Sequence, residues 1–212
     1  MKKTALFLCV FGCLLTIKAQ DRKNTFVPQK IGFLYNVANQ QTFLFNDKDY
    51  NYQTSVYKAQ LYFKVASWKW IDFELIVQPQ YQQITHQLLN VQFVTPEDPD
   101  YEQKRIAYTQ IKTMNLYALE FGLSLKILLF KKLYLKSVLG LGAGAIDTQT
   151  ERLAKGFTFI ENASLGLSYQ TTKKTHLYLA GNIGHVSNFN FQRPNSGYNL
   201  MGFELGFSYS LH

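Results

Sequence analysis

The chain has 212 residues and a formal net charge of +8, from 22 Lys and Arg against 14 Asp and Glu. That length permits one domain of ordinary size, and the 14 Tyr and 17 Phe are a heavier aromatic load than a water-soluble domain needs. The only two cysteines, Cys9 and Cys13, lie near the N-terminus, so disulfides and thiolate chemistry are excluded from the rest of the chain.

The first 20 residues have the pattern of a secretory signal peptide. Two lysines and an apolar run precede small residues near Ala19, which provide a cleavage site. The apolar run is too short for a transmembrane helix, and no later stretch has the 18 consecutive apolar residues that such a helix requires. Lipidation at Cys13 is an alternative reading of the same segment. We expect residues 1–20 to be a signal peptide and residues 21–212 to form one exported domain.

From residue 30 onward the dominant period is two residues, which is the period of a β-strand with two different faces. Odd positions carry large apolar side chains almost throughout, whereas even positions carry glycine, serine and charged residues. The alternation predicts eight strands, at residues 30–39, 54–67, 70–84, 113–127, 132–146, 157–170, 175–188 and 199–211.

The charged residues at even positions are balanced in sign. They are four lysines and four acids: Lys58, Lys64, Lys126, Lys136, Asp72, Glu74, Glu120 and Glu204. Balanced charge suits a closed interior, where unpaired charges are costly. The apolar odd face then suits lipid, and closure of the sheet satisfies every backbone group there. We therefore expect an all-β fold, an eight-stranded antiparallel transmembrane β-barrel.

The connections between the predicted strands alternate strictly in length. Those at 68–69, 128–131 and 171–174 are short, whereas the others are longer and more polar. Outer-membrane barrels show this pattern, with short periplasmic turns and longer external loops. Trp68 and Trp70 flank the first short turn, where an interfacial aromatic belt is expected.

A soluble, lipocalin-like barrel is the structural competitor, because it also has eight strands. Such a barrel would place the apolar face inside and the charges outside. Phe, Leu and Tyr at nearly every odd position would overfill so small an interior, which favours the membrane barrel. The basic net charge suits a phosphate-bearing membrane surface as partner rather than nucleic acid, although simple solubility explains it equally well.

His185 and Ser187 end the seventh predicted strand, just before an external loop. Residues two apart share one face of a strand, so the two side chains point the same way. Both positions are odd, and we expect the pair on the outer wall, near the outer-leaflet headgroups. Together they could act as general base and nucleophile. The alternative is an interfacial histidine beside a strand-terminal serine, because His-x-Ser recurs by chance.

The wider motif runs from His185 through Ser187 and Asn188 to Asn195 and Gly197, before the last strand. It resembles that of the PagL-type lipid A 3-O-deacylases (acyloxyacyl hydrolases) of the Gram-negative outer membrane. The resemblance implies an outer-membrane esterase that removes an ester-linked acyl chain from lipid A with Ser, His and Glu. It implies Ser187 as nucleophile and His185 as general base, with the two asparagines and the glycine supporting the site or its oxyanion.

The sequence departs from that family at one position, where the family's glutamate is Asn199. An amide oxygen can orient the imidazole but supplies no charge. Glu161 is a candidate for the missing acid, because it is the only acid at an odd position within a predicted strand. If the sixth and seventh strands pair through their short turn, Glu161 lies opposite His185. A β-bulge that turns Glu161 inward is the competing interpretation.

Two functions remain in view. The first is an outer-membrane lipid A deacylase that hydrolyses lipopolysaccharide through Ser187 and His185. The second is a weak or inactive barrel of the same family that binds lipid or a partner, and a purely structural or adhesive barrel is a more distant third. We expect no metal and no cofactor, because the other histidines, at 86, 176 and 212, lack metal-ligand spacing.

Overall fold

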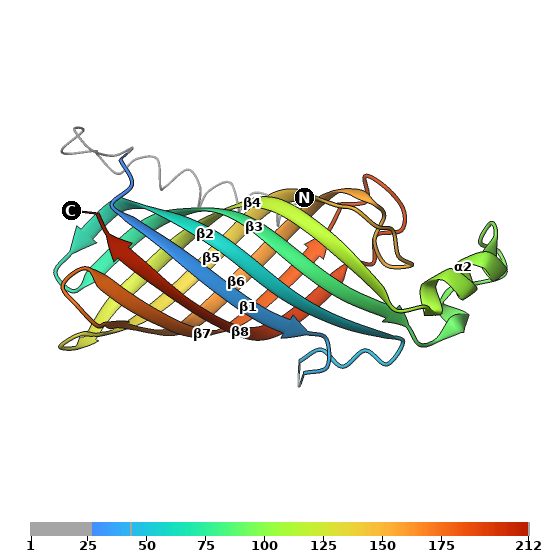
Figure 1. Cartoon of the computed structure of the whole chain (residues 1–212), viewed down its shortest axis with the longest axis horizontal. Helices are drawn as coiled ribbons and strands as arrows, with labels where there is room; N and C mark the ends of the chain where they lie inside the picture. Colours follow the sequence, from blue (N-terminus) through green and yellow to red (C-terminus); the bar gives the residue numbers. More distant parts are fainter. Residues whose placement is uncertain (1–26, 43, 212) are drawn as a thin grey trace, which may run out of the picture.

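Eight antiparallel strands close into a barrel in the computed structural model, which describes residues 27–42 and 44–211 (Figure 1). The strands are β1 (Lys30–Asn39), β2 (Tyr50–Trp68), β3 (Ile71–Leu88), β4 (Lys112–Phe130), β5 (Leu133–Ile146), β6 (Gly156–Gln170), β7 (Thr175–Ser187) and β8 (Tyr198–Ser210). Each strand pairs with its neighbours in sequence, and β8 pairs with β1 to close the barrel. The predicted eight-stranded barrel is confirmed. The predicted signal peptide and both cysteines lie outside the described residues.

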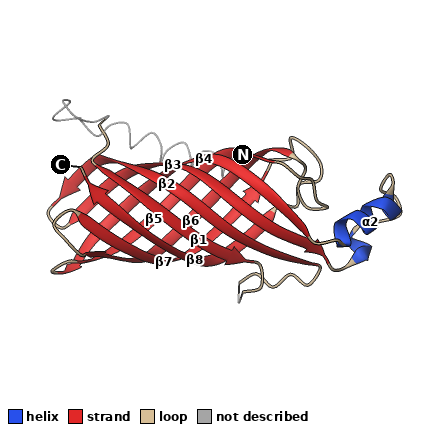
Figure 2. Cartoon of the chain, in the orientation of Figure 1, coloured by secondary structure: helices blue, strands red, loops and turns tan. Residues whose placement is uncertain are grey.

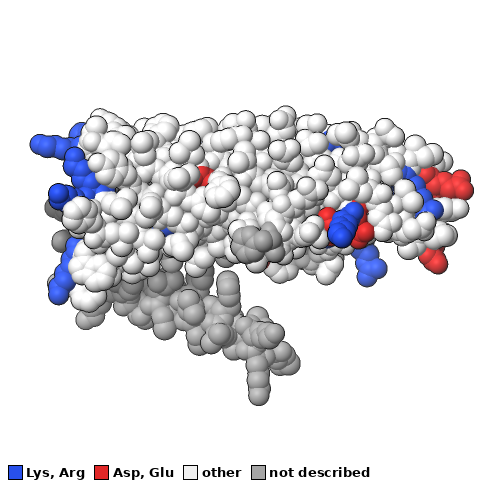
Figure 3. All heavy atoms as spheres, turned by 90° about the horizontal axis from the view of Figure 1, so that it is seen from below, with Lys and Arg blue, Asp and Glu red and all other residues white. Residues whose placement is uncertain are grey.

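The two faces of the wall follow the predicted alternation. Phe121, Leu139 and Leu205 point outward and are 50%, 63% and 59% exposed, whereas Glu120 and Glu204 point inward and are 1% and 3% exposed. An apolar outer face suits hydrocarbon, and a polar interior suits a closed lumen. The lipocalin-like arrangement, with the apolar face inside, is wrong for this chain. One face of the wall is almost free of charge between its two ends (Figure 3).

Two β-bulges modify the alternation close to the short turns. One lies between Lys64 and Ala66 in β2, and the other precedes Phe130 in β4. Each shifts the register by one residue, so that Trp68 and Phe130 come onto the outer face, where they are 66% and 65% exposed. The predicted aromatic belt is present, and Lys64 lies opposite Glu74 on the lumen side as predicted, exposed because it is close to the end of the barrel.

The two ends of the barrel differ. Tight turns at 69–70, 131–132 and 171–174 join strands at one end, whereas longer loops join them at the other (Figure 2). The loop at 89–111 contains η1 (Val91–Phe93) and α2 (Tyr101–Thr109). In the described part of the chain, neither helix is long and apolar enough to cross a membrane. Strands β2, β3 and β4 have 18 or 19 residues, against 13 to 15 in β5 to β8.

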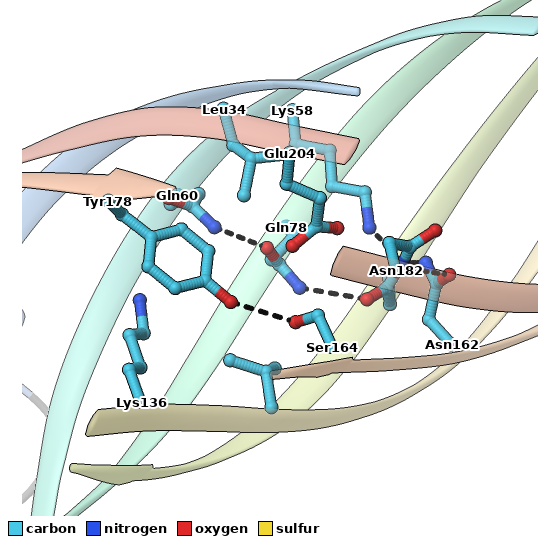
Figure 4. Close-up of a pocket in the computed structure, with 12 residues that line it drawn as sticks. Leu34, Lys58, Gln60, Gln78, Lys136, Asn162, Ser164, Tyr178, Asn182 and Glu204 are labelled. Carbon is cyan, nitrogen blue, oxygen red and sulfur yellow. Dashed lines mark hydrogen bonds and ion pairs between the residues drawn. The ribbon is translucent and has the colours of Figure 1, made fainter. Parts of the chain in front are cut away.

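The middle of the lumen is filled by a polar network centred on Glu120. Its carboxylate accepts hydrogen bonds from Gln78 and Gln80, each at 2.9 Å, and from Asn162 at 3.0 Å, and it pairs with Lys58 at 2.9 Å. Lys58, Gln78 and Asn162 come from different strands and point into the lumen (Figure 4). A buried charge is tolerated when its opposite charge and its remaining hydrogen bonds are all supplied. The network therefore replaces the hydration that these groups would have in water.

The packing of β8 against β1 yields a test of the fold. A Cβ added to Gly202 would overlap the Val37 carbonyl oxygen and come within 2.6 Å of the Ala38 Cα, both of which are backbone atoms. We expect Gly202→Ala to lower the free energy of unfolding by about 1–3 kcal/mol, because the closing strand pair must separate. Denaturant titration in detergent micelles, read by the faster electrophoretic mobility of the folded barrel, measures the change.

Gly181→Ala is the matched control, because nothing lies within 4 Å of a Cβ built at Gly181 on the outer face. This variant should stay within about 0.5 kcal/mol of the parent. Equal stability of the two variants would contradict the close packing at the closing seam.

Candidate active site

His185 lies in β7 between two polar residues on the outer wall. Glu161 in β6 and Asn199 in β8 are its direct partners in register. Both partners are exposed and the histidine is half-buried. The predicted register between Glu161 and His185 is confirmed. The pairing of β6 with β7 contains no bulge, so the interpretation that turned Glu161 inward is wrong.

The imidazole of His185 is oriented by Asn199. The distance between His185 Nδ1 and Asn199 Oδ1 is 2.7 Å. An amide oxygen only accepts hydrogen bonds, so Nδ1 carries the proton in this arrangement and Nε2 presents its lone pair. Asn199 therefore selects the tautomer that a general base requires, although it adds no negative charge.

Ser187 is the last residue of β7 and shares the outer face with His185. Its direct partner in β6 is Phe159. Over residues 27–42 and 44–211, no hydrogen bond joins Ser187 to His185. The hydrogen bonds of catalytic groups are often long in free enzymes and shorten when substrate binds.

Glu161 is the carboxylate next to the imidazole in this row. Direct cross-strand partners have Cβ atoms about 4.5–5.5 Å apart, which is within reach of a glutamate side chain. Among the described residues, Glu161 forms no ion pair with His185. Glu161 thus lies beside the imidazole in β6, whereas Asn199 in β8 bonds to Nδ1.

The two asparagines of the motif shape the loop at 188–197. Asn195 Oδ1 accepts the backbone N–H of Asn188 at 2.7 Å, and Asn188 Nδ2 donates to the Gln192 carbonyl at 2.9 Å. Asn188 is fully buried. Asn195 Nδ2 donates to Asn190 Oδ1 at 3.3 Å, which leaves its second N–H hydrogen available. Each side-chain amide thus keeps one N–H hydrogen, but Asn188 is fully buried whereas Asn195 is partly exposed.

Gly197 brings the end of this loop over the imidazole. Its φ of +68° lies in the left-handed region that favours glycine. A Cβ at this position would lie 2.9 Å from His185 Cε1 and 3.2 Å from Nε2. Glycine therefore allows the backbone to approach Nε2 of the imidazole.

Sequence analysis missed an aromatic cluster beside Ser187. Phe159 meets Phe157 and Phe189 edge to face, each at 4.7 Å between ring centroids, and Phe191 stacks on Phe157 at 6.2 Å. The register that placed Glu161 opposite His185 also places Phe159 opposite Ser187, so this part could have been found. Arg152, which contacts the backbone of Gly197, was also missed, and no periodicity marks a loop arginine.

One cavity is bordered by Glu161 and His185 together with inward-facing residues such as Asn162. Another is separate from this row. It is lined by residues that include Lys58, Gln78 and Glu204, which face inward (Figure 4). Ser187 is not among its lining residues, so the cavity lies on the other side of the sheet. Nor do the described residues contain a group of three or more His, Cys, Asp or Glu side chains placed to hold a metal ion.

Comparison with known proteins gives a family and a fold. The sequence profile of the family described as "Lipid A 3-O-deacylase (PagL)" matches residues 34–208. The crystal structure of the outer membrane enzyme PagL is similar, with a TM-score of 0.52 and 11% identity over 86% of this chain and 99% of that chain. Neisserial surface protein A gives a TM-score of 0.46, with 11% identity over 86% and 96% of the two chains. No curated protein matches.

Proposed function

The chain belongs to the PagL family of lipid A 3-O-deacylases, and from this premise we propose that Ser187 and His185 remove an ester-linked acyl chain from lipid A. The observation that carries the proposal is the row of Glu161, His185 and Asn199 on the outer wall, with Ser187 beside it. Polar side chains on the lipid-facing wall cost free energy, and such residues usually mark a functional site. An ester at the headgroup boundary of the outer leaflet would reach it.

The reaction proceeds in two steps. His185 Nε2 takes the proton of Ser187 as Oγ attacks the ester carbonyl, and the same proton then passes to the departing sugar oxygen. The acyl chain is now esterified to Ser187. A water molecule, activated by the same nitrogen, releases it as a fatty acid and returns the proton to Oγ. No metal or cofactor takes part in either step.

The oxyanion of each tetrahedral intermediate needs hydrogen-bond donors. Asn195 is our candidate, because its second N–H hydrogen remains free on the loop that follows Ser187. Asn188 is a poorer candidate, because its side chain is fully buried and its backbone N–H already bonds to Asn195 Oδ1. We assign Asn188 the role of holding the loop in shape, and Gly197 that of letting the loop approach His185.

The imidazolium formed during the reaction needs negative charge nearby. Asn199 holds the correct tautomer but is neutral, and replacing the acid of a serine triad by its amide costs about 10⁴ in turnover in a well-studied protease. In that protease the loss is attributed to the wrong tautomer, whereas Asn199 accepts the Nδ1 proton here. Glu161 supplies the charge from the opposite side of the ring.

The substrate sets the location of the protein. Lipid A is the membrane anchor of lipopolysaccharide, and we place the barrel in the outer membrane with its long loops outside. Export requires a signal peptide, which we assign to residues 1–20. Both assignments fit a family of outer-membrane barrels.

A second function, lipid or partner binding without hydrolysis, is favoured by one feature. The carboxylate that the family places beside its histidine is the amide of Asn199. A barrel that has lost turnover but kept its lipid-facing row would bind lipid A and leave its acyl chains intact.

Mass spectrometry separates these functions. Purified protein in detergent, incubated with lipid A, should release one acyl chain by loss of the 3-O ester. Ser187→Ala should lower the rate by at least about 10³-fold, because the nucleophile is gone. Lipid A that stays intact with the folded parent protein would instead favour the binding function.

The source of negative charge is tested by two further variants. Glu161→Gln should lower kcat about tenfold or more, because the imidazolium loses its only carboxylate neighbour in the row. Asn199→Glu should raise kcat by a similar factor, since it restores a carboxylate at Nδ1. Initial rates on lipid A at saturating substrate measure both. Unchanged turnover in Glu161→Gln would rule out its role.

A further inference from the structure

We propose that Arg152 is the positioning residue of the site: it holds Gly197 against the His185 imidazole and so fixes Nε2 toward Ser187. The inference rests on the proposed roles of His185 and Ser187. It concerns a residue in the loop at 147–155, which lies outside the motif and was not marked by the sequence pattern.

Arg152 and Gly197 are joined by two reciprocal hydrogen bonds. The Gly197 N–H donates to the Arg152 carbonyl at 3.0 Å, and Arg152 Nε donates to the Gly197 carbonyl at 2.8 Å. Gly197 is therefore held at both of its backbone polar groups by one residue. Because Gly197 lies directly against the ring of His185, this pair of bonds limits where the imidazole can move.

The guanidinium of Arg152 is itself anchored by the other external loops. It lies 4.2 Å from the ring centroid of Tyr50 and 5.5 Å from that of Phe93, and Nη1 is 3.6 Å from Asp47 Oδ2. Only 12% of its side chain is exposed. These contacts come from the loop at 40–49, the start of β2 and the loop at 89–111. Arg152 itself lies in the loop at 147–155 and bonds to Gly197 in the loop before β8, so it connects all four external loops.

The residues on either side of Arg152 are also fixed. Glu151 pairs with His86 of β3 at 2.9 Å, and both side chains are buried. Leu153 is fully buried and forms a β-bridge with Asn195. These contacts hold the backbone of the loop at 147–155, so the Arg152 side chain starts from a fixed point.

The consequence for catalysis follows from distance. A general base must come within about 2.6–3.2 Å of the hydroxyl whose proton it takes. A displacement of about 1 Å can cost about 10²-fold in rate. Release of Gly197 would let the imidazole swing while leaving the lipid-binding wall unchanged. Loss of Arg152 should therefore affect kcat more than KM.

Kinetics of Arg152→Met test this, because methionine keeps apolar contact with Tyr50 and Phe93 but cannot donate to Gly197. We expect kcat on lipid A to fall about 10- to 100-fold with KM within about twofold. Asp47→Asn is the matched control: it removes the ion pair at 3.6 Å and keeps both Gly197 bonds and the contacts with Tyr50 and Phe93. Its kcat should stay near that of the parent.

A second measurement does not depend on turnover. The ¹⁵N chemical shift of His185 Nε2, assigned by comparison with His185→Gln, should change in Arg152→Met and stay constant in Asp47→Asn. Unchanged shift and kcat in Arg152→Met, or equal losses in both variants, would overturn the inference. If the parent itself leaves lipid A intact, the proposed function fails, and the chemical shift alone decides whether Arg152 positions the ring.

A different observation carries a second inference: we propose that the end of the barrel with tight turns binds anionic phospholipid headgroups of the periplasmic leaflet. The tight turns carry five exposed lysines and no acid: Lys69, Lys131, Lys132, Lys173 and Lys174. We call these residues the lysine rim. Lysine and arginine gather at this end (Figure 3), whereas the opposite loops mix acidic and basic residues.

The lysines lie against aromatic side chains at the edge of the wall. Lys69 is 5.6 Å from the ring of Trp68, and Lys131 is 5.0 Å from that of Phe130. Such side chains keep their stems on apolar surface and present the ammonium group at headgroup level. Nearby, Lys64 adds another exposed cation, and the half-buried Asp72 accepts a hydrogen bond from Ser67. Each lysine near an anionic membrane surface adds to the electrostatic attraction.

The two tryptophans of the chain, Trp68 and Trp70, lie at this rim and report on its lipid neighbours. The barrel is folded into phosphatidylcholine vesicles that contain brominated phosphatidylglycerol, or brominated phosphatidylcholine at the same fraction. We expect stronger quenching by the anionic lipid, and loss of that preference at about 1 M salt, where the screening length is about 3 Å.

The variant for this test replaces Lys131, Lys132, Lys173 and Lys174 by Gln and keeps Lys69 beside the fluorophore. It should abolish the preference, whereas Lys48→Gln with Lys155→Gln, on the external loops, should keep it. Equal quenching of the parent by the two brominated lipids, or a preference that persists in the four-lysine variant, would refute the binding.

Discussion

Pairing of the backbone within a closed sheet is the constraint on which this molecule depends. In hydrocarbon, every N–H and C=O must bond within the protein, and a barrel achieves this by joining its last strand to its first. Closure fixes the register of all eight strands, and with it the face on which each side chain lies. The polar row on the outer wall is a product of this constraint: Glu161, His185 and Asn199 are neighbours because the β6–β7 and β7–β8 registers agree.

Much of this arrangement could be predicted from sequence, because strands have a simple period. Alternation gave the eight strands and their two faces, and one short turn was sufficient to place Glu161 opposite His185. The error at β3 has a local cause. The strand continues past its predicted end, so that His86 lies within a strand and pairs with Glu151. Those residues of β3 lie near the loops, where polar side chains interrupt the pattern.

The loops could not be predicted in the same way, because no period governs them. Their order comes from particular contacts, such as those of Arg152 with Gly197 and Tyr50, between segments far apart in sequence. The positions of the motif asparagines also depend on loop geometry: Asn188 and Asn195 have the same chemistry, but Asn188 is fully buried and Asn195 is partly exposed. The family resemblance indicated which residues gather at the site, and the coordinates assign donors and acceptors among them.

The unequal strand lengths give the barrel an oblique upper edge. At the usual tilt, the 13 residues of β7 rise about 33 Å, whereas the 19 residues of β2 or β4 rise about 48 Å. The tall side therefore stands about 15 Å above the low side, which carries Ser187. A lipid that diffuses sideways in its leaflet meets the low side with its sugars at the height of the serine. For the proposed reaction, entry would therefore be lateral, and no lipid would have to leave the bilayer.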